Sequence, residues 1–196
     1  MMFENDTSHG TCNFKPSHIM SVCTLAALLL MGACTPTTTD RLKLKPLETV
    51  REVDLNRYLG TWYEIASFPQ SFQKGCTETT ATYSMRDNGE IDVFNRCRLG
   101  TPDGKEKSAL GRARVIDSNN NARLEVSFFR PFWGDYWIID LDPNYEYSVV
   151  GHPGRDYLWI LSRTPTMSSL VYEGILERLR KQQYQVERLR KTFHSK

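Results

Sequence analysis

The sequence predicts an all-β domain of eight short antiparallel strands followed by one helix, and three observations predict it. Segments rich in β-branched and aromatic residues recur between residues 60 and 163, and turn residues separate them. The strands follow one another without internal helices or a Rossmann-type glycine loop. After Pro165 the apolar residues change to helical spacing. Many short strands at even spacing indicate either a sandwich or a barrel.

The first strand is expected over residues 60–69, which read GTWYEIASFP. Alternation places Trp62, Glu64 and Ala66 on one face and Tyr63, Ile65 and Ser67 on the other. Bulky apolar residues therefore lie on both faces, whereas a half-buried strand would collect them on one face.

Seven further strands follow in meander order. They are expected over residues 79–85, 91–100, 109–117, 123–134, 135–142, 146–151 and 156–163. The first of the connecting turns, RDNGE at residues 86–90, has Asn-Gly at its centre, which is a strong signal for a tight hairpin.

The helix after Pro165 is amphipathic. Val171, Ile175 and Leu179 form its apolar stripe, which we expect to pack on the outside of the strands. The basic tail VERLRKTFHSK is either a last strand or a loose end, so the domain is expected to span residues 55–196.

The start of the chain has the pattern of an exported lipoprotein. Residues 22–33, VCTLAALLLMGA, carry no charge. They are short of the ~20 residues that span a bilayer, which suits a signal peptide over residues 1–33. The alternative, a buried helix, is disfavoured by the Pro/Thr-rich tether that follows it. Residues 30–34, LMGAC, resemble a bacterial lipobox, so Cys34 is predicted to be lipidated. Residues 34–54 are then the lipidated terminus, a linker and a strap.

The five cysteines divide among these segments. Cys12 and Cys23 fall in the signal peptide and Cys34 carries the lipid. Cys76 and Cys97 remain as a pair in an oxidising compartment, where a disulfide is the usual outcome. Simple hairpin register leaves them about two positions from direct opposition, and a bulge beside Gly75 would correct this.

Charge and composition favour a binding protein. The net charge of +2 and the absence of a basic stripe in the domain argue against nucleic acid as a partner. The sequence has no Cys/His cluster of the kind that suggests a metal site. No Ser/His/Asp set or carboxylate pair converges on one place, so we expect no enzyme and no cofactor.

Three motifs in order resemble the signature regions of the lipocalins. They are Gly60-Thr61-Trp62-Tyr63, Leu141-Asp142-Pro143-Asn144-Tyr145 and Ser162-Arg163. The resemblance covers roughly residues 55–181 and is greatest to bacterial outer-membrane lipoproteins. The second motif departs from the usual Thr-Asp-Tyr. The resemblance implies an eight-stranded up-and-down antiparallel barrel with the C-terminal helix packed outside.

The resemblance also implies structural roles. Trp62 would close one end of the barrel, Arg163 would lie across its ring, and Gly60, Asp142 and Tyr145 would shape the surrounding turns. At the other end, Phe72, Phe129, Phe132 and Trp133 are expected in rim loops.

The implied function is lipid binding inside the barrel. Alternation and alignment to the family predict an inward set consisting of Ala81, Tyr83, Val93, Val126, Phe128, Tyr136, Ile138 and Trp159. The implied ligand is a fatty acid or lysophospholipid, handled for membrane maintenance. The protein would be anchored through Cys34 in the outer membrane, facing the periplasm, with a homodimer possible. Two alternatives stay open: an enzyme using Cys97 as a free cavity nucleophile, or a passive envelope lipoprotein whose barrel is filled.

Overall fold

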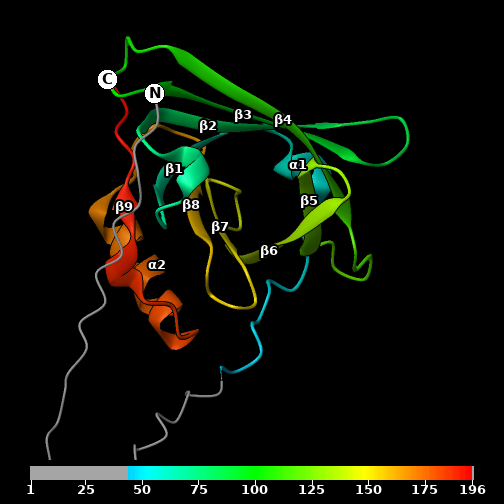
Figure 1. The fold of residues 1–196 in the computed structure, drawn as a ribbon. Helices are drawn as coiled ribbons and strands as arrows, with labels where there is room; N and C mark the ends of the chain where they lie inside the picture. Colours follow the sequence, from blue (N-terminus) through cyan, green and yellow to red (C-terminus); the bar gives the residue numbers. More distant parts are fainter. Residues whose placement is uncertain (1–43, 196) are drawn as a thin grey trace, which may run out of the picture. The chain divides into compact units, whose positions relative to one another are not determined.

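The computed structural model describes residues 44–195, which form one antiparallel sheet with a helix on its outside (Figure 1). The expected signal peptide and Cys34 lie outside the described residues. The strands are β1 Gly60–Ser67, β2 Cys76–Met85, β3 Ile91–Leu99, β4 Glu106–Val115, β5 Arg123–Phe129, β6 Phe132–Leu141, β7 Tyr147–Gly151, β8 Leu158–Ser162 and β9 Arg190–Lys191. The helices are α1 Leu55–Tyr58, η1 Ser71–Gln73, α2 Ser169–Lys181 and η2 Val186–Arg188.

The sheet closes on itself. Its strands run β2-β3-β4-β5-β6-β7-β8-β1-β9, and β1 also pairs with β2. Each neighbouring pair is antiparallel, so the eight main strands form the up-and-down barrel that the resemblance implied, and the sandwich alternative is excluded. β1 begins at the end of the barrel that carries Trp62, which we call the closed end, and runs toward the open end.

A register shift in β1 explains why apolar residues lie on both of its faces. The pairing with β8 shifts between Glu64 and Ala66. Trp62 therefore belongs to the cluster inside the barrel, whereas Ile65 and Ala66 both belong to the cluster outside it. The expectation that Ala66 shares a face with Trp62 is wrong, because strict alternation does not survive a bulge.

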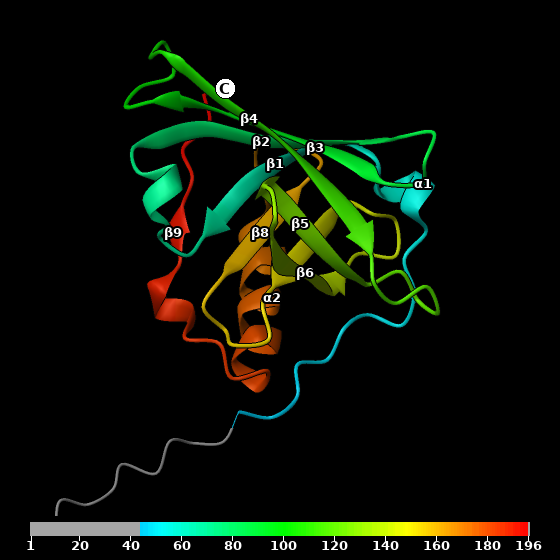
Figure 2. The ribbon, with the colours of Figure 1, turned by 45° about the vertical axis from the view of Figure 1, so that its right-hand side comes forward.

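Helix α2 covers the outside of the barrel (Figures 1 and 2). The Ser168 side chain accepts a hydrogen bond from the Val171 amide, which caps the first turn. The buried residues of the helix are Tyr172, Ile175, Leu176 and Leu179. They share the outer cluster with residues of β1 and β6–β8. Val171, which we placed in the buried stripe, is 38% exposed, so the stripe lies one residue further along at that end.

The closed end is held by Arg163. Its guanidinium carbon lies 3.7 Å from the centre of the Trp62 ring. The same guanidinium donates hydrogen bonds to the carbonyl oxygens of Arg57 at 2.6 Å and Thr61 at 3.0 Å. Gly60 has φ +90°, a conformation that side chains disfavour, and a Cβ there would lie 3.5 Å from an Arg163 nitrogen.

The second motif forms the turn between β6 and β7. A carboxylate oxygen of Asp142 accepts hydrogen bonds from the amides of Asn144 and Glu146. Tyr145 stands at φ +63°, and its hydroxyl accepts a hydrogen bond from the Asp54 amide at 2.8 Å. The turn thus ties the entry segment to the barrel.

The C-terminal tail completes the wall between β1 and β2. Pairing of β1 with β2 ends at Tyr63, and β9 pairs instead with Ala66 and Ser67. Beyond β9, the Glu78 amide donates to the Phe193 carbonyl oxygen at 2.8 Å, so the tail bridges both strands. Of the two possibilities left open by the sequence, the strand is confirmed for Arg190–Lys191 alone, and the tail begins with the 3-10 helix η2.

Residues 41–196 form one compact unit. Both buried clusters, every strand pair and the disulfide lie within residues 44–195, so this unit has its own core and is expected to fold without the preceding residues. None of the helices within residues 44–195 has the length and apolar character required to cross a bilayer.

Candidate functional site

The closed half of the barrel interior is filled by hydrogen-bonded tyrosines. The Tyr136 hydroxyl lies 3.0 Å from that of Tyr58 and 2.8 Å from that of Tyr83. The Tyr58 hydroxyl also lies 3.0 Å from the Ser148 hydroxyl. Burial raises the pKa of all three tyrosines, so they remain neutral. This half is a packed core with its polar groups satisfied.

The interior face opens toward the other end. On β4, Ala113 is paired with Ile91 and is 3% exposed. Four residues nearer the open end, Ala109 lies on the same face, paired with Asn95, and is exposed. Ala109 precedes the part of β4 that pairs with β5, so the inward face of β4 is uncovered toward the open end.

The wall is also incomplete on one side of this open half. β3 pairs with β4 along Glu106–Ala113, but β5 pairs with β4 only between Arg112 and Val115. The hairpin of β3 and β4 therefore extends beyond β5 (Figure 2). A ligand could enter the open half from the end or from this side.

Seven of the eight residues of the expected inward set contribute to the inner cluster. Tyr83, Val93, Tyr136 and Ile138 are buried, and Ala81, Val126 and Trp159 are partly buried against them. The buried four belong to the filled half. Trp159, which pairs with Ser67, is nearest the open end.

Phe128, the eighth residue, is more exposed than the other seven. It is 37% exposed, and its ring packs on Gly111, where a Cβ would lie 2.8 Å away. Gly111 pairs with the inward-facing Val93, so a Cβ there would point into the barrel, and the Phe128 ring that it would meet lies on the interior side of β4.

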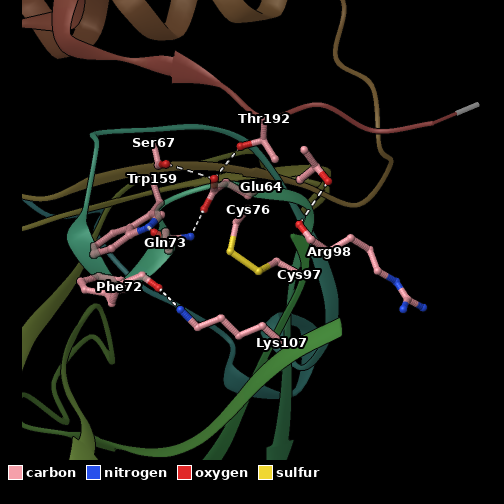
Figure 3. The surroundings of a disulfide bond; sticks show 11 residues. Glu64, Ser67, Phe72, Gln73, Cys76, Cys97, Arg98, Lys107, Trp159 and Thr192 are labelled. Carbon is pink, nitrogen blue, oxygen red and sulfur yellow. Dashed lines mark hydrogen bonds between the residues drawn. A yellow bond between two sulfur atoms is a disulfide. The ribbon is translucent and has the colours of Figure 1, made fainter. Parts of the chain in front are cut away.

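A buried carboxylate organises the open end (Figure 3). Glu64 is 5% exposed, and it accepts hydrogen bonds from Ser67 at 3.0 Å, Gln73 at 2.7 Å and Thr192 at 2.5 Å. The Gln73 amide oxygen accepts a bond from the Trp159 indole nitrogen at 3.1 Å. The Glu64 carboxylate thus connects β1 to the first rim loop and to the C-terminal tail. Trp159 connects β8 to the same network through Gln73.

The disulfide between Cys76 and Cys97 is confirmed, with a Cα–Cα distance of 5.5 Å (Figure 3). The bulge that accompanies it lies between Thr77 and Thr80, not beside Gly75. Cys97 has no free thiol in this state, so the alternative of a cysteine nucleophile loses its reactive group. Among residues 44–195, no group of three or more potential ligands has the arrangement of a metal site.

Apolar side chains are exposed at the open end. Phe72 lies in η1, but the expected loop position of Phe129, Phe132 and Trp133 is wrong, because Phe129 ends β5 and pairs with Phe132, the first residue of β6. Phe72 is 54% exposed, Phe129 80% and Phe132 76%. The ammonium of Lys107, whose partner on β3 is Cys97, donates to the Phe72 carbonyl oxygen at 2.7 Å. A cation therefore lies beside the open half, close to apolar surface.

Sequence reasoning missed the network around Glu64. An acidic residue inside an apolar strand was a usable signal, because a carboxylate is rarely buried without hydrogen-bond partners. Its partners were not readable, since Gln73 comes from a loop and Thr192 from a tail that is far away in sequence. His194 lies in the tail for which no contact was predicted, yet its Nε2 lies 2.8 Å from the Glu64 carbonyl oxygen.

The closed barrel, its outer helix and the stacked Trp62–Arg163 pair define a small-ligand binding barrel, and the chain belongs to the lipocalin family. Residues 53–194 match the family described as a lipocalin-like domain. The chain is 44% identical over 156 residues to outer membrane lipoprotein Blc of Escherichia coli (strain K12), covering 79% of this chain and 85% of the relative. It is 38% identical over 160 residues to temperature-induced lipocalin-1 of Arabidopsis thaliana, covering 77% and 84%.

Solved structures support the fold. Insecticyanin from the tobacco hornworm Manduca sexta superposes with a TM-score of 0.62 at 17% identity, covering 78% of this chain and 86% of that one. Apocrustacyanin C2 superposes with a TM-score of 0.58 at 16% identity, covering 72% and 80%.

Proposed function

We propose that this protein is an outer-membrane lipoprotein that binds a fatty acid or a lysophospholipid in the open half of its barrel. The observation that carries the proposal is the change along the inward face of β4, from buried Ala113 to exposed Ala109. The filled half forms a floor, so the ligand would occupy only the upper part, where apolar walls favour an acyl chain.

The polar end of the ligand would lie near Lys107. Glu64 already accepts three hydrogen bonds, so its charge is stabilised within the protein. The Lys107 ammonium has one carbonyl partner and is exposed, which leaves it able to pair with a carboxylate or phosphate. An anionic single-chain lipid fits this combination.

The proposed location at the outer membrane is supported by two independent features. Relatives at 44% and 40% identity carry the name outer membrane lipoprotein. The lipobox-like residues 30–34 predict acylation at Cys34, and Thr35 after it favours the outer membrane. Lipid handling at that membrane, for its maintenance, follows from the ligand class and the anchor together.

A titration of the delipidated domain, residues 41–196, with a fluorescent fatty acid tests the ligand site. Ala109→Trp would fill the open half and is expected to weaken binding at least about tenfold, since a displaced acyl segment of two CH₂ groups forfeits ~1.6 kcal/mol. Leu110→Trp is the matched control, because Leu110 is the next residue, lies on the opposite face and is 63% exposed.

Equal binding by both variants would contradict a ligand inside the barrel. Absence of saturable binding by the parent domain would favour the passive envelope lipoprotein. Lys107→Gln is expected to weaken fatty-acid binding about fivefold when the carboxylate is ionised, against a Lys105→Gln control with the same charge change.

A further inference from the structure

A groove outside the inner cluster crosses the wall of the barrel from β3 to β6. Its volume is about 210 Å³. The lining side chains that carry the argument below are Arg86, Arg112, Ser127, Phe128, Arg130 and Trp133. The floor of the groove is a row of cross-strand partners, since Asp92 pairs with Arg112 and Arg112 with Ser127. Their neighbours Val93 and Ala113 belong to the inner cluster, so this row faces outward.

The groove carries an excess of positive charge. Arg86 is paired with Asp92 at 2.6 Å, and Arg112 lies 3.6 Å from Glu90 just beyond the groove. Arg130 forms no ion pair within residues 44–195. The guanidinium groups keep unused donors on their exposed edges, because each has five N–H groups and a carboxylate contact uses only some. An anion is therefore the ligand that this charge favours.

Two polar atoms in the groove lack partners. Ser127 is 7% exposed, and its hydroxyl finds no hydrogen-bond partner among residues 44–195. The Nε of Arg86 is likewise buried without a partner. A buried donor left unsatisfied is costly, and both of these donors line one groove. Both atoms have almost no exposed surface, so an oxyanion in the groove would accept a hydrogen bond from either after a rotation of that side chain.

Exposed aromatic residues continue from the groove to the tip of the β5–β6 hairpin. Phe129 and Phe132 flank the tip and are 80% and 76% exposed. Arg130 lies between them in sequence, and Trp133 lines the groove. Aromatic side chains next to arginines suit the boundary between acyl chains and headgroups, where apolar rings are buried and cations meet phosphates.

We propose that this groove binds the phosphate of an anionic phospholipid at a bilayer surface, with the β5–β6 tip inserted beside it. The site is separate from the ligand site in the barrel interior. It would orient the domain on the membrane so that the open half faces the lipid. The chemistry required is a phosphate oxyanion on a headgroup, held by Arg112, Arg130 and the Ser127 hydroxyl.

Vesicle binding by the domain of residues 41–196 tests the proposal. Vesicles of phosphatidylglycerol mixed with phosphatidylcholine are expected to bind the domain, and phosphatidylcholine alone to bind it several-fold more weakly. Arg130→Gln is expected to reduce the binding to the anionic vesicles about fivefold, the effect of one basic residue at an anionic surface. Lys105→Gln removes the same charge from an exposed loop away from the groove and is expected to change the binding less than twofold.

Ser127→Ala separates a binding site from a structural defect. It removes a buried unsatisfied hydroxyl, so it is expected to leave the melting temperature unchanged or raised. If the hydroxyl binds phosphate, the same variant binds the anionic vesicles at least twofold more weakly. Unchanged vesicle binding by Ser127→Ala, or equal losses in Arg130→Gln and Lys105→Gln, would overturn the proposal. So would binding of inorganic phosphate that depends on Arg130 while Arg130→Gln still binds the vesicles as the parent does.

Discussion

Replacing Arg163 by alanine should destabilise the barrel without affecting its ligand site. The guanidinium stacks 3.7 Å from the Trp62 ring centre and donates short hydrogen bonds to the carbonyl oxygens of Arg57 and Thr61. The cation–π contact contributes ~1 kcal/mol at a partly exposed site. Two hydrogen bonds from a charged donor contribute ~1 kcal/mol each after discounting for solvent. The free energy of unfolding should therefore fall by about 3 kcal/mol.

A loss of that size should be visible in thermal unfolding. For a domain of this length, ~1 kcal/mol corresponds to ~2–4 °C, so the melting temperature should fall by about 6–12 °C. Urea titration followed by tryptophan fluorescence gives the free energy independently, and the slope should stay constant if only stability changes. Fatty-acid affinity, measured where the variant is fully folded, should stay within about twofold of the parent because Arg163 lies at the closed end.

Arg163→Lys is the informative control. Lysine keeps the charge but lacks the planar face and the fork of donors, so it should recover less than half of the lost free energy. If Arg163→Ala lowered the free energy of unfolding by less than ~0.5 kcal/mol, the reasoning would be refuted, since that is the range of ordinary surface substitutions. A large loss of affinity at full folding would instead show that the closed end is coupled to the ligand site.

Three further predictions concern the core and the tail. Tyr136→Phe should lower the free energy of unfolding in urea by ~1–3 kcal/mol, because it leaves the buried Tyr83 hydroxyl without its 2.8 Å partner. An unchanged urea midpoint would mean that water replaces this hydrogen bond. Replacing Cys76 and Cys97 together by serine should lower the free energy of unfolding by about 3 kcal/mol, since the disulfide closes a loop of 21 residues. A parent domain whose urea midpoint does not change on adding reductant would contradict this prediction. Burial raises the pKa of Tyr184 to about 12. Its unfolded form ionises near pH 10, so stability is full below pH 10 and should fall between pH 10 and 12, and the fall should be smaller in Tyr184→Phe.

The order of the eight barrel strands could be predicted because each carries its own local pattern, whereas the two-residue β9 could not. The eight segments and the amphipathic helix were readable from periodicity and turn residues, and three short motifs were enough to indicate the barrel. The disulfide also followed, because only Cys76 and Cys97 remained after the leader and the anchor were set aside. These features depend on residues that are close in sequence or on counting.

Apart from the Glu64 network, whose partners are distant in sequence, the features that sequence reasoning missed depend on register. A bulge in β1 moved Ala66 to the outer face. A bulge adds one residue to one strand, and nothing in composition marks where it falls. The same limit explains Val171, since the direction of a helix stripe is set by the wall against which it packs.

The position of the C-terminal strand has a consequence for how the protein is made. The wall between β1 and β2 is completed by residues 190–193, which pair with strands more than a hundred residues earlier in the chain. The barrel therefore cannot close fully until residues 190–193 have been synthesised. Until then the edge of β1 beyond Tyr63 and the buried carboxylate of Glu64 lack their final partners, and an exposed strand edge invites pairing with other chains.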